Sequence, residues 1–156
     1  MNLKPQLVVF DFDGVLTDNR VFVFEDGREG VFCNRSDGVG FNLLKKYNFR
    51  TIIISSENNN VVHSRAKKLE VECFYGQENK LNTLKEYCKK FSINLSDVLF
   101  IGNDLNDYEV MEAVGVTACP ADAHDKIIKI STFKLSKKGG FGVCREIAEE
   151  ILQLKY

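Results

Sequence analysis

Short apolar runs alternate along the chain with segments in which apolar residues recur every three or four positions. One continuous run covers residues 6–10 and ends at Asp11, and another covers residues 51–55. Runs of this kind are typical of parallel strands that are buried on both faces. Three shorter runs follow, at residues 71–75, 98–101 and 116–119.

The intervening segments have the spacing of amphipathic helices. Apolar residues recur at helical intervals between positions 81 and 91 and again between positions 143 and 154, which predicts one buried face for each helix. Three further helices are expected over residues 38–47, 58–69 and 104–114. Strands that alternate with helices predict an α/β fold with a Rossmann-like, doubly wound parallel sheet, here as one domain over residues 1–156.

A β-hairpin interrupts this alternation at about residues 20–34. Two apolar arms, residues 21–24 and 30–33, flank a turn that contains Asp26 and Gly27, and Asp-Gly is a strong hairpin signal. An isolated hairpin is marginally stable in water. The arms are therefore expected to pack either on their own domain or on another subunit.

Composition narrows the class of protein. Of 156 residues, 44% are hydrophobic and 28% charged, and the net charge is −1, which indicates a soluble globular protein and argues against nucleic-acid binding. The five cysteines form no CxxC pair, so neither a zinc site nor a disulfide framework is indicated. No apolar run is long enough to span a membrane, and we expect a cytoplasmic protein with reduced thiols.

Candidate chemistry begins where the first predicted strand ends. Asp11 and Asp13 follow that strand directly, and Gly14 comes next, where the chain must turn. The carboxyl ends of the strands form the ligand crevice of an open α/β sheet. A lone DxD pair is a common turn or cap, but two carboxylates at this place are poorly explained by packing.

Other polar groups follow the later strands. Ser55 closes the second run, Lys80 opens the helix after the third, and residues 102–107 (GNDLND) follow the fourth. Taken singly, these residues would be read as a helix cap, a solvated lysine and first-turn acids. Because all of them fall at strand ends, we expect them to meet in one crevice.

With these pieces in place, the sequence resembles the haloacid dehalogenase superfamily of aspartyl-phosphate phosphatases over essentially its whole length. Residues 11–18 (DFDGVLTD) resemble the first motif of that family, Ser55 the second, Lys80 the third and residues 102–107 the fourth. Only 25 positions separate Ser55 from Lys80, which leaves room for one helix and one strand. A cap domain is therefore not expected.

The resemblance implies a role for each of these residues. Asp11 would be the nucleophile and a Mg²⁺ ligand, and Asp13 would act as general acid and base while its carbonyl oxygen binds the metal. Ser55 would bind a phosphoryl oxygen and Lys80 would neutralise charge. The fourth motif usually begins Gly-Asp, whereas Asn103 stands here. Asn103 is the expected metal ligand, with Asp104 as its rival and Asp107 as a partner of Lys80.

Residues 32–38 and 139–146 resemble a capless branch of the family that dephosphorylates 3-deoxy-ulosonic acids and forms tetramers in which the hairpin reaches a neighbour. Its octulosonate 8-phosphate phosphatases usually carry Gly-Arg after the second motif, whereas Ser56 and Glu57 stand here, as in the nine-carbon 9-phosphate phosphatases. A nine-carbon ulosonic acid 9-phosphate, such as that of KDN or N-acetylneuraminate, is therefore the expected substrate. The expected substrate-binding residues are Asn34, Asp37, Glu57, Arg65, Lys68 and Arg145.

Other interpretations stay open. Glu57, Arg65 and Lys68 would also be acceptable as surface charges on an exposed helix. The substrate could instead be the eight-carbon 8-phosphate. A signalling receiver domain would need an acceptor aspartate at another strand end, where Ser55 and Ser56 stand. The domain could also be a non-catalytic tetramerisation module associated with an acylneuraminate cytidylyltransferase.

Overall fold

A six-stranded, entirely parallel sheet forms the centre of the computed structural model, which describes residues 3–156. The central strand, β1, pairs with β4 on one side and β6 on the other. In spatial order the strands are β5 (Glu72–Phe74), β4 (Arg50–Ile54), β1 (Leu7–Phe10), β6 (Val98–Ile101), β7 (Val116–Cys119) and β8 (Phe133–Lys134).

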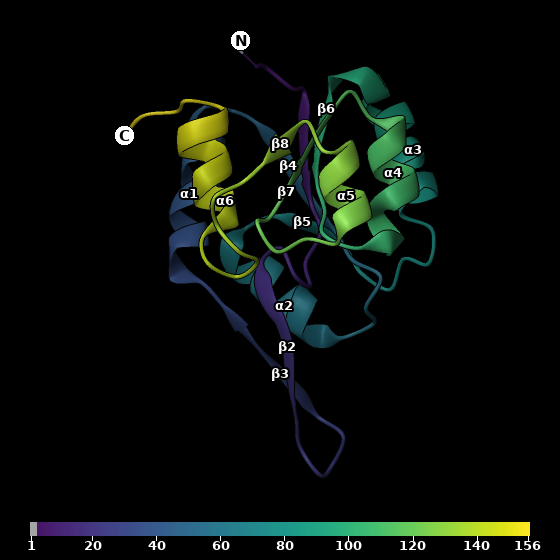
Figure 1. Cartoon of the computed structure of the whole chain (residues 1–156), viewed down its shortest axis with the longest axis vertical. Helices are drawn as coiled ribbons and strands as arrows, with labels where there is room; N and C mark the ends of the chain where they lie inside the picture. Colours follow the sequence, from purple (N-terminus) through teal and green to yellow (C-terminus); the bar gives the residue numbers. More distant parts are fainter. Residues whose placement is uncertain (1–2) are drawn as a thin grey trace.

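Helices cover both faces of the sheet, and two separate apolar cores result (Figure 1). On one face lie α1 (Arg35–Lys46), α2 (Asn60–Leu69) and α6 (Val143–Glu146), and on the other lie α3 (Lys80–Phe91), α4 (Tyr108–Ala113) and α5 (Asp125–Ile130). Successive side chains of β1 point to opposite faces, so Val8 and Phe10 enter the first core while Leu7 and Val9 enter the second. The predicted doubly wound α/β fold is confirmed.

Several elements differ from their predicted bounds. The short β8 and α5 were not predicted, because two and six residues carry too little periodicity. The helix expected over residues 104–114 is divided into a 3-10 turn, η2 (Leu105–Asp107), and α4. Near the C-terminus α6 continues into a π-helical turn, η3 (Ile147–Ile151). A further 3-10 turn, η1 (Leu95–Asp97), precedes β6.

The hairpin consists of β2 (Thr17–Val23) and β3 (Glu29–Cys33) and extends away from the sheet (Figure 1). Val31 and Cys33 of β3 contact the first core. The outer apolar side chains of the hairpin do not pack on their own domain, because Phe22 and Phe32 are 60% and 67% exposed. Between Ser55 and Lys80 the chain contains only α2 and β5, so no cap domain lies there. Within residues 3–156, no helix is both long and apolar enough to cross a membrane.

Asp37 is buried where α1 meets α6. Its Oδ1 accepts a hydrogen bond from the Cys144 amide at 2.9 Å, while its Oδ2 has no partner among the residues that the structure describes. Burial raises the pKa of Asp37 from 3.8 to about 6, although the Cys144 amide and the Arg65 guanidinium oppose the shift. The folded state therefore disfavours the ionised carboxylate.

The pKa of Asp37 predicts a pH-dependent stability. Because the folded-state pKa is raised, the contribution of Asp37 is fully present below its unfolded pKa and is lost as the pH rises through about 6. The loss amounts to about 3 kcal/mol, at 1.36 kcal/mol per pKa unit. Asp37→Asn keeps an acceptor for Cys144 but does not ionise. Its stability relative to wild type should rise by that amount between about pH 4 and about pH 7.

Urea unfolding of both proteins across this pH range measures the difference. If the two free energies of unfolding instead run parallel with pH, Asp37 does not have the raised pKa that its burial implies.

Candidate active site

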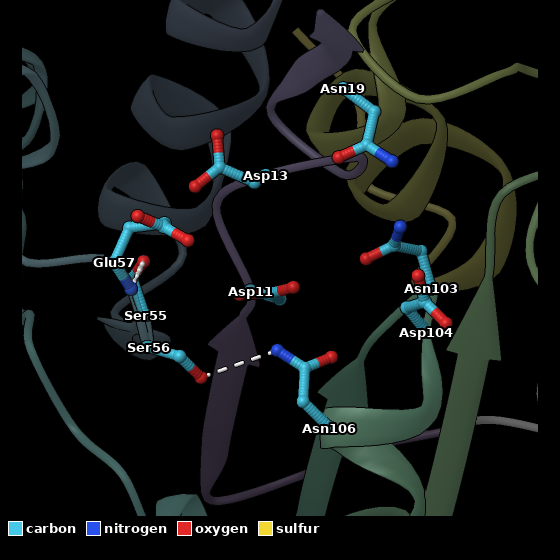
Figure 2. A pocket seen from close by; sticks show the side chains of 9 residues that line it. All are labelled: Asp11, Asp13, Asn19, Ser55, Ser56, Glu57, Asn103, Asp104 and Asn106. Carbon is cyan, nitrogen blue, oxygen red and sulfur yellow. Dashed lines mark hydrogen bonds between the residues drawn. The ribbon is translucent and has the colours of Figure 1, made fainter. Parts of the chain in front are cut away.

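A polar pocket lies at the carboxyl edge of the sheet, where β1, β4 and β6 end. Figure 2 shows the Asp11 carboxylate at its centre, with Ser55 and Glu57 on one side and Asn103 on the other. The lining residues are Asp11, Asp13, Asn19, Ser55, Ser56, Glu57, Asn103, Asp104 and Asn106. The structure thus brings the predicted catalytic groups of three strand ends to one place.

A tight turn after β1 places Asp11 and Asp13. The Phe12 carbonyl accepts hydrogen bonds from the amides of Val15, Leu16 and Thr17 at 3.3, 2.9 and 3.2 Å. Gly14 has a φ of 77°, and a Cβ atom there would lie 2.0 Å from the Asn103 amide nitrogen. Glycine is therefore required both for the turn and for the approach of Asn103.

Lys80 joins two of the strand ends through buried ion pairs. Its Nζ lies 2.6 Å from Asp11 Oδ1 and 2.6 Å from Asp107 Oδ1, and all three side chains are buried. Burial disfavours the ammonium, but the two carboxylates outweigh that effect and raise the pKa of Lys80. Lys80 therefore stays charged and forms ion pairs with both carboxylates.

Asp107 also shapes the fourth motif. Its Oδ2 accepts hydrogen bonds from the amides of Asn103 at 2.9 Å and Asp104 at 3.4 Å. Asp104 turns its own Oδ1 to the Leu105 amide at 2.7 Å and caps η2. Asp107 contacts Lys80, as predicted. Asp104, the rival candidate for the metal, has a structural partner of its own.

Three oxygen atoms lie close together at Asp11: its own Oδ2, the Asn103 amide oxygen and the Asp13 carbonyl oxygen. The Asn103 amide oxygen lies 3.1 Å from Asp11 Oδ2 and 2.8 Å from the Asp13 carbonyl oxygen; a half-turn of the amide would place its nitrogen there and form two hydrogen bonds. Adjacent ligands of an octahedral Mg²⁺ ion lie about 3 Å apart, because each metal–oxygen bond is about 2.1 Å. The oxygen-facing orientation therefore fits a magnesium site, and the other suits the metal-free protein.

The charges of the pocket also favour a cation. Burial and the neighbouring Asp107 raise the pKa of Asp11 from 3.8 to about 8, and Lys80 only partly offsets this. Two buried carboxylates share one ammonium, which leaves an excess negative charge. A divalent cation beside Asp11 would compensate that charge and keep the carboxylate ionised.

Asp13 and Ser55 lie on the other side of Asp11. Burial, followed by the nearby Glu57 carboxylate, raises the pKa of Asp13, which favours the proton-donating form. The Ser55 hydroxyl accepts a hydrogen bond from the Glu57 amide at 3.2 Å, so its own proton is available for a ligand. Asp13 can thus exchange a proton, and Ser55 can bind an anion.

Glu57 alone among the six predicted substrate-binding residues lines this pocket in the described chain. The Arg65 guanidinium donates to the Asn34 carbonyl at 2.8 Å, and Arg65 and Lys68 line a separate hollow beside α1. Asp37 is buried under α6, and Arg145 pairs with Glu149 at 2.9 Å. Within one chain, Asn34, Asp37, Arg65, Lys68 and Arg145 therefore lie outside the pocket, because each is engaged by the scaffold or faces another hollow.

Three lining residues, Asn19, Ser56 and Asn106, were not among the predicted site residues. Asn106 donates to the Ser56 hydroxyl at 3.2 Å across the pocket mouth (Figure 2). Asn19 has a φ of 64°, a left-handed conformation that asparagine tolerates better than most residues. Asn106 lies within the fourth motif and Asn19 directly follows the first, and these positions are the signal that would have pointed to them.

Comparison with known proteins agrees with this geometry. The family model for haloacid dehalogenase-like hydrolases matches residues 41–147. The chain belongs to this family. A 3-deoxy-D-manno-octulosonate 8-phosphate phosphatase from Salmonella typhi is 32% identical over 148 residues, which cover 94% of this chain and 79% of that protein. The prediction of a phosphatase, a phosphoric monoester hydrolase, is confirmed.

Solved structures of family members superimpose closely. The octulosonate 8-phosphate phosphatase of Moraxella catarrhalis, solved with magnesium, phosphate and KDO, has a TM-score of 0.92 at 30% identity and covers 97% of this chain and 88% of its own. The cobalt-bound phosphatase of Haemophilus influenzae also has a TM-score of 0.92, at 26% identity, with 98% and 91% covered. Both likenesses extend over almost the whole chain.

The geometry favours Asn103 over Asp104 as a metal ligand, and titration calorimetry with Mg²⁺ compares the two. Asn103→Ala removes a converging oxygen and should weaken Mg²⁺ binding at least about tenfold, which corresponds to about 1.4 kcal/mol. Asp104→Ala should weaken it only a few-fold through lost charge. That variant should instead lose about 1 kcal/mol of stability with its cap. A larger loss of Mg²⁺ affinity in Asp104→Ala would reverse the assignment.

Proposed function

We propose that this phosphatase hydrolyses the phosphate monoester of a 3-deoxy-ulosonic acid through a phosphoryl-aspartate on Asp11. The observation that carries the proposal is the buried contact of Asp11 with Lys80, next to the three converging oxygens of Asp11, Asp13 and Asn103. A carboxylate can attack a phosphate dianion only if cationic groups reduce the repulsion between them.

The proposed metal is Mg²⁺, held by Asp11 Oδ2, the Asp13 carbonyl oxygen and the Asn103 amide oxygen. When bound, it would neutralise charge on the phosphate and the nucleophile. Lys80 contributes a second positive charge from the opposite side of Asp11, through Oδ1. Because one carboxylate oxygen faces each cation, the Asp11 side chain is fixed between them.

Asp11 forms a bond to phosphorus while the bond from phosphorus to the sugar oxygen breaks. Asp13 gives its proton to that leaving oxygen and is then ionised. In the second step Asp13 takes a proton from water as the water oxygen attacks phosphorus, and the Asp11–phosphorus bond breaks to release phosphate. The Ser55 hydroxyl binds a phosphoryl oxygen throughout.

The number of carbon atoms in the sugar acid distinguishes the two candidate substrates. The names of the relatives favour the eight-carbon 8-phosphate. Ser56 and Glu57, at the place where Gly-Arg would be expected for that substrate, favour a nine-carbon 9-phosphate. Glu57 lines the pocket, where its carboxylate can accept hydrogen bonds from sugar hydroxyls but would repel a sugar carboxylate. We therefore propose the nine-carbon ester, with the eight-carbon ester as the alternative.

The sugar carboxylate requires a cation that one pocket does not provide. Lys80, the buried ammonium beneath the pocket, is already shared by Asp11 and Asp107. Arg65, Lys68 and Arg145 lie elsewhere on the same chain, and the hairpin arms are exposed. A homotetramer in which the hairpin contacts a neighbour would bury these arms and bring a second chain to each pocket, in the cytoplasmic protein that we propose.

Release of inorganic phosphate from the two esters tests the proposal. With Mg²⁺, wild type should turn over the nine-carbon 9-phosphate with a higher kcat/KM than the eight-carbon 8-phosphate. Glu57→Arg should shift that ratio towards the eight-carbon ester by about tenfold or more, because it replaces an acceptor with a cation. EDTA should stop both reactions.

Asp11→Asn is the matched control, because it keeps the shape of the side chain and removes the nucleophile. Its kcat should fall by several orders of magnitude. Equal phosphate release by wild type and Asp11→Asn would refute the enzyme mechanism and favour a non-catalytic assembly module. If wild type clearly prefers the eight-carbon ester, only the role of Glu57 in selecting the nine-carbon ester is overturned.

A further inference from the structure

Residues 136–142, between β8 and α6, run directly behind the turn that carries Asp13. The Gly140 amide donates to the Val15 carbonyl at 2.9 Å. A Cβ atom on Gly139 would lie 2.0 Å from the Gly14 carbonyl oxygen, and one on Gly140 would lie 2.4 Å from the Asp18 amide nitrogen. The two segments therefore meet backbone to backbone, which only glycine permits here.

Side chains from other elements fix this segment from behind. Glu146 accepts hydrogen bonds from the amides of Ser136 at 2.7 Å and Lys137 at 2.9 Å. Asp122 accepts one from the Gly139 amide at 2.9 Å. The Asn34 side-chain amide donates to the Gly140 carbonyl at 3.2 Å. None of these side chains lines the pocket, yet together they attach residues 136–142 to three separate parts of the fold.

The Asp13 side chain is itself weakly held. Its contact with the Thr17 hydroxyl is long, at 3.5 Å, and such a bond restrains little. The same hydroxyl accepts a hydrogen bond from the Gly14 amide at 3.2 Å. The Thr17 backbone lies directly against the Gly139–Gly140 pair. The place of the Asp13 carboxylate is therefore set mainly by where the turn lies.

We infer that residues 136–142 are a positioning element for Asp13, and that Gly139 and Asp122 are the positioning residues through which it acts. The inference rests on the proposed function, in which Asp13 gives its proton to the leaving oxygen. A small displacement of the turn lengthens the path of that proton and leaves Asp11, Lys80 and Ser55 in place. Because the turn also carries the Asp13 carbonyl oxygen, a proposed Mg²⁺ ligand, the variants are compared at saturating Mg²⁺. Phosphoryl transfer should become slower for esters whose leaving group needs a proton, and should stay unchanged for esters whose leaving group needs none.

Comparing the hydrolysis of two esters distinguishes a positioning role from a structural one. The sugar-acid phosphate that wild type hydrolyses fastest has an alkoxide leaving group that needs a proton, whereas p-nitrophenyl phosphate releases a stable phenolate without one. For each, kcat/KM reports the steps up to transfer of phosphorus to Asp11. Gly139→Ala should lower kcat/KM for the sugar ester by about 10- to 100-fold, and for p-nitrophenyl phosphate by no more than about 3-fold.

Gly38→Ala is the matched control, because a Cβ atom on Gly38 would lie 3.8 Å from Leu69, an ordinary contact. It should leave both values of kcat/KM unchanged. If Gly139→Ala lowers kcat/KM equally for both esters, or for neither, the positioning role is overturned.

Asp122 provides a milder test that does not depend on the folding of Gly139→Ala. Asp122→Ala removes the acceptor of the Gly139 amide and should lower kcat/KM for the sugar ester by several-fold with little change for p-nitrophenyl phosphate. Asp122→Asn keeps an acceptor oxygen and should restore the wild-type ratio. An unchanged ratio in Asp122→Ala would contradict the inference, whereas a wild-type protein inactive on both esters would instead contradict the proposed function.

Discussion

The contact of one buried ammonium with two buried carboxylates is the constraint on which the rest of the site depends. Lys80 lies within 2.6 Å of both Asp11 and Asp107. A buried ion pair loses its hydration and is kept only where its remaining charges and hydrogen bonds are satisfied. Asp107 is satisfied by the amides of the fourth motif. On Asp11, by contrast, Oδ1 contacts Lys80 while Oδ2 faces the Asn103 amide oxygen, which is an acceptor like itself.

This imbalance connects the fold to the chemistry. Parallel strands bring Asp11, Ser55 and Asn103 to one edge, and α3 brings Lys80 to the same edge from its first residue. The scaffold thereby holds like charges together before any ligand is bound. The phosphate and the proposed cation complete a charge pattern that the chain alone leaves unfinished, so little rearrangement is needed when they bind.

The sequence was sufficient for five strands of the sheet, for the helices on its two faces and for the meeting of polar side chains at one edge, because apolar runs mark buried strands and polar groups follow several strand ends. It was insufficient for β8 and α5, which are held by neighbours more than by their own periodicity. The pairing of Asp107 with Lys80 was predicted, whereas the contact of Gly139 with Gly14 was not. Such a contact joins backbones that are far apart in sequence, and no side-chain pattern records it. For the same reason Asp37 was predicted to bind substrate, whereas its buried carboxylate accepts a hydrogen bond from the Cys144 amide of α6.

The most direct measurement is a rapid-quench experiment. Wild-type protein is mixed with Mg²⁺ and the sugar-acid phosphate, stopped in acid within the first turnover, digested and analysed by mass spectrometry. A phosphoryl group should appear on the peptide that contains Asp11 and be absent from the Asp11→Asn protein. A phosphoryl group on another residue, or full phosphate release with Asp11 unmodified at every time point, would contradict the account.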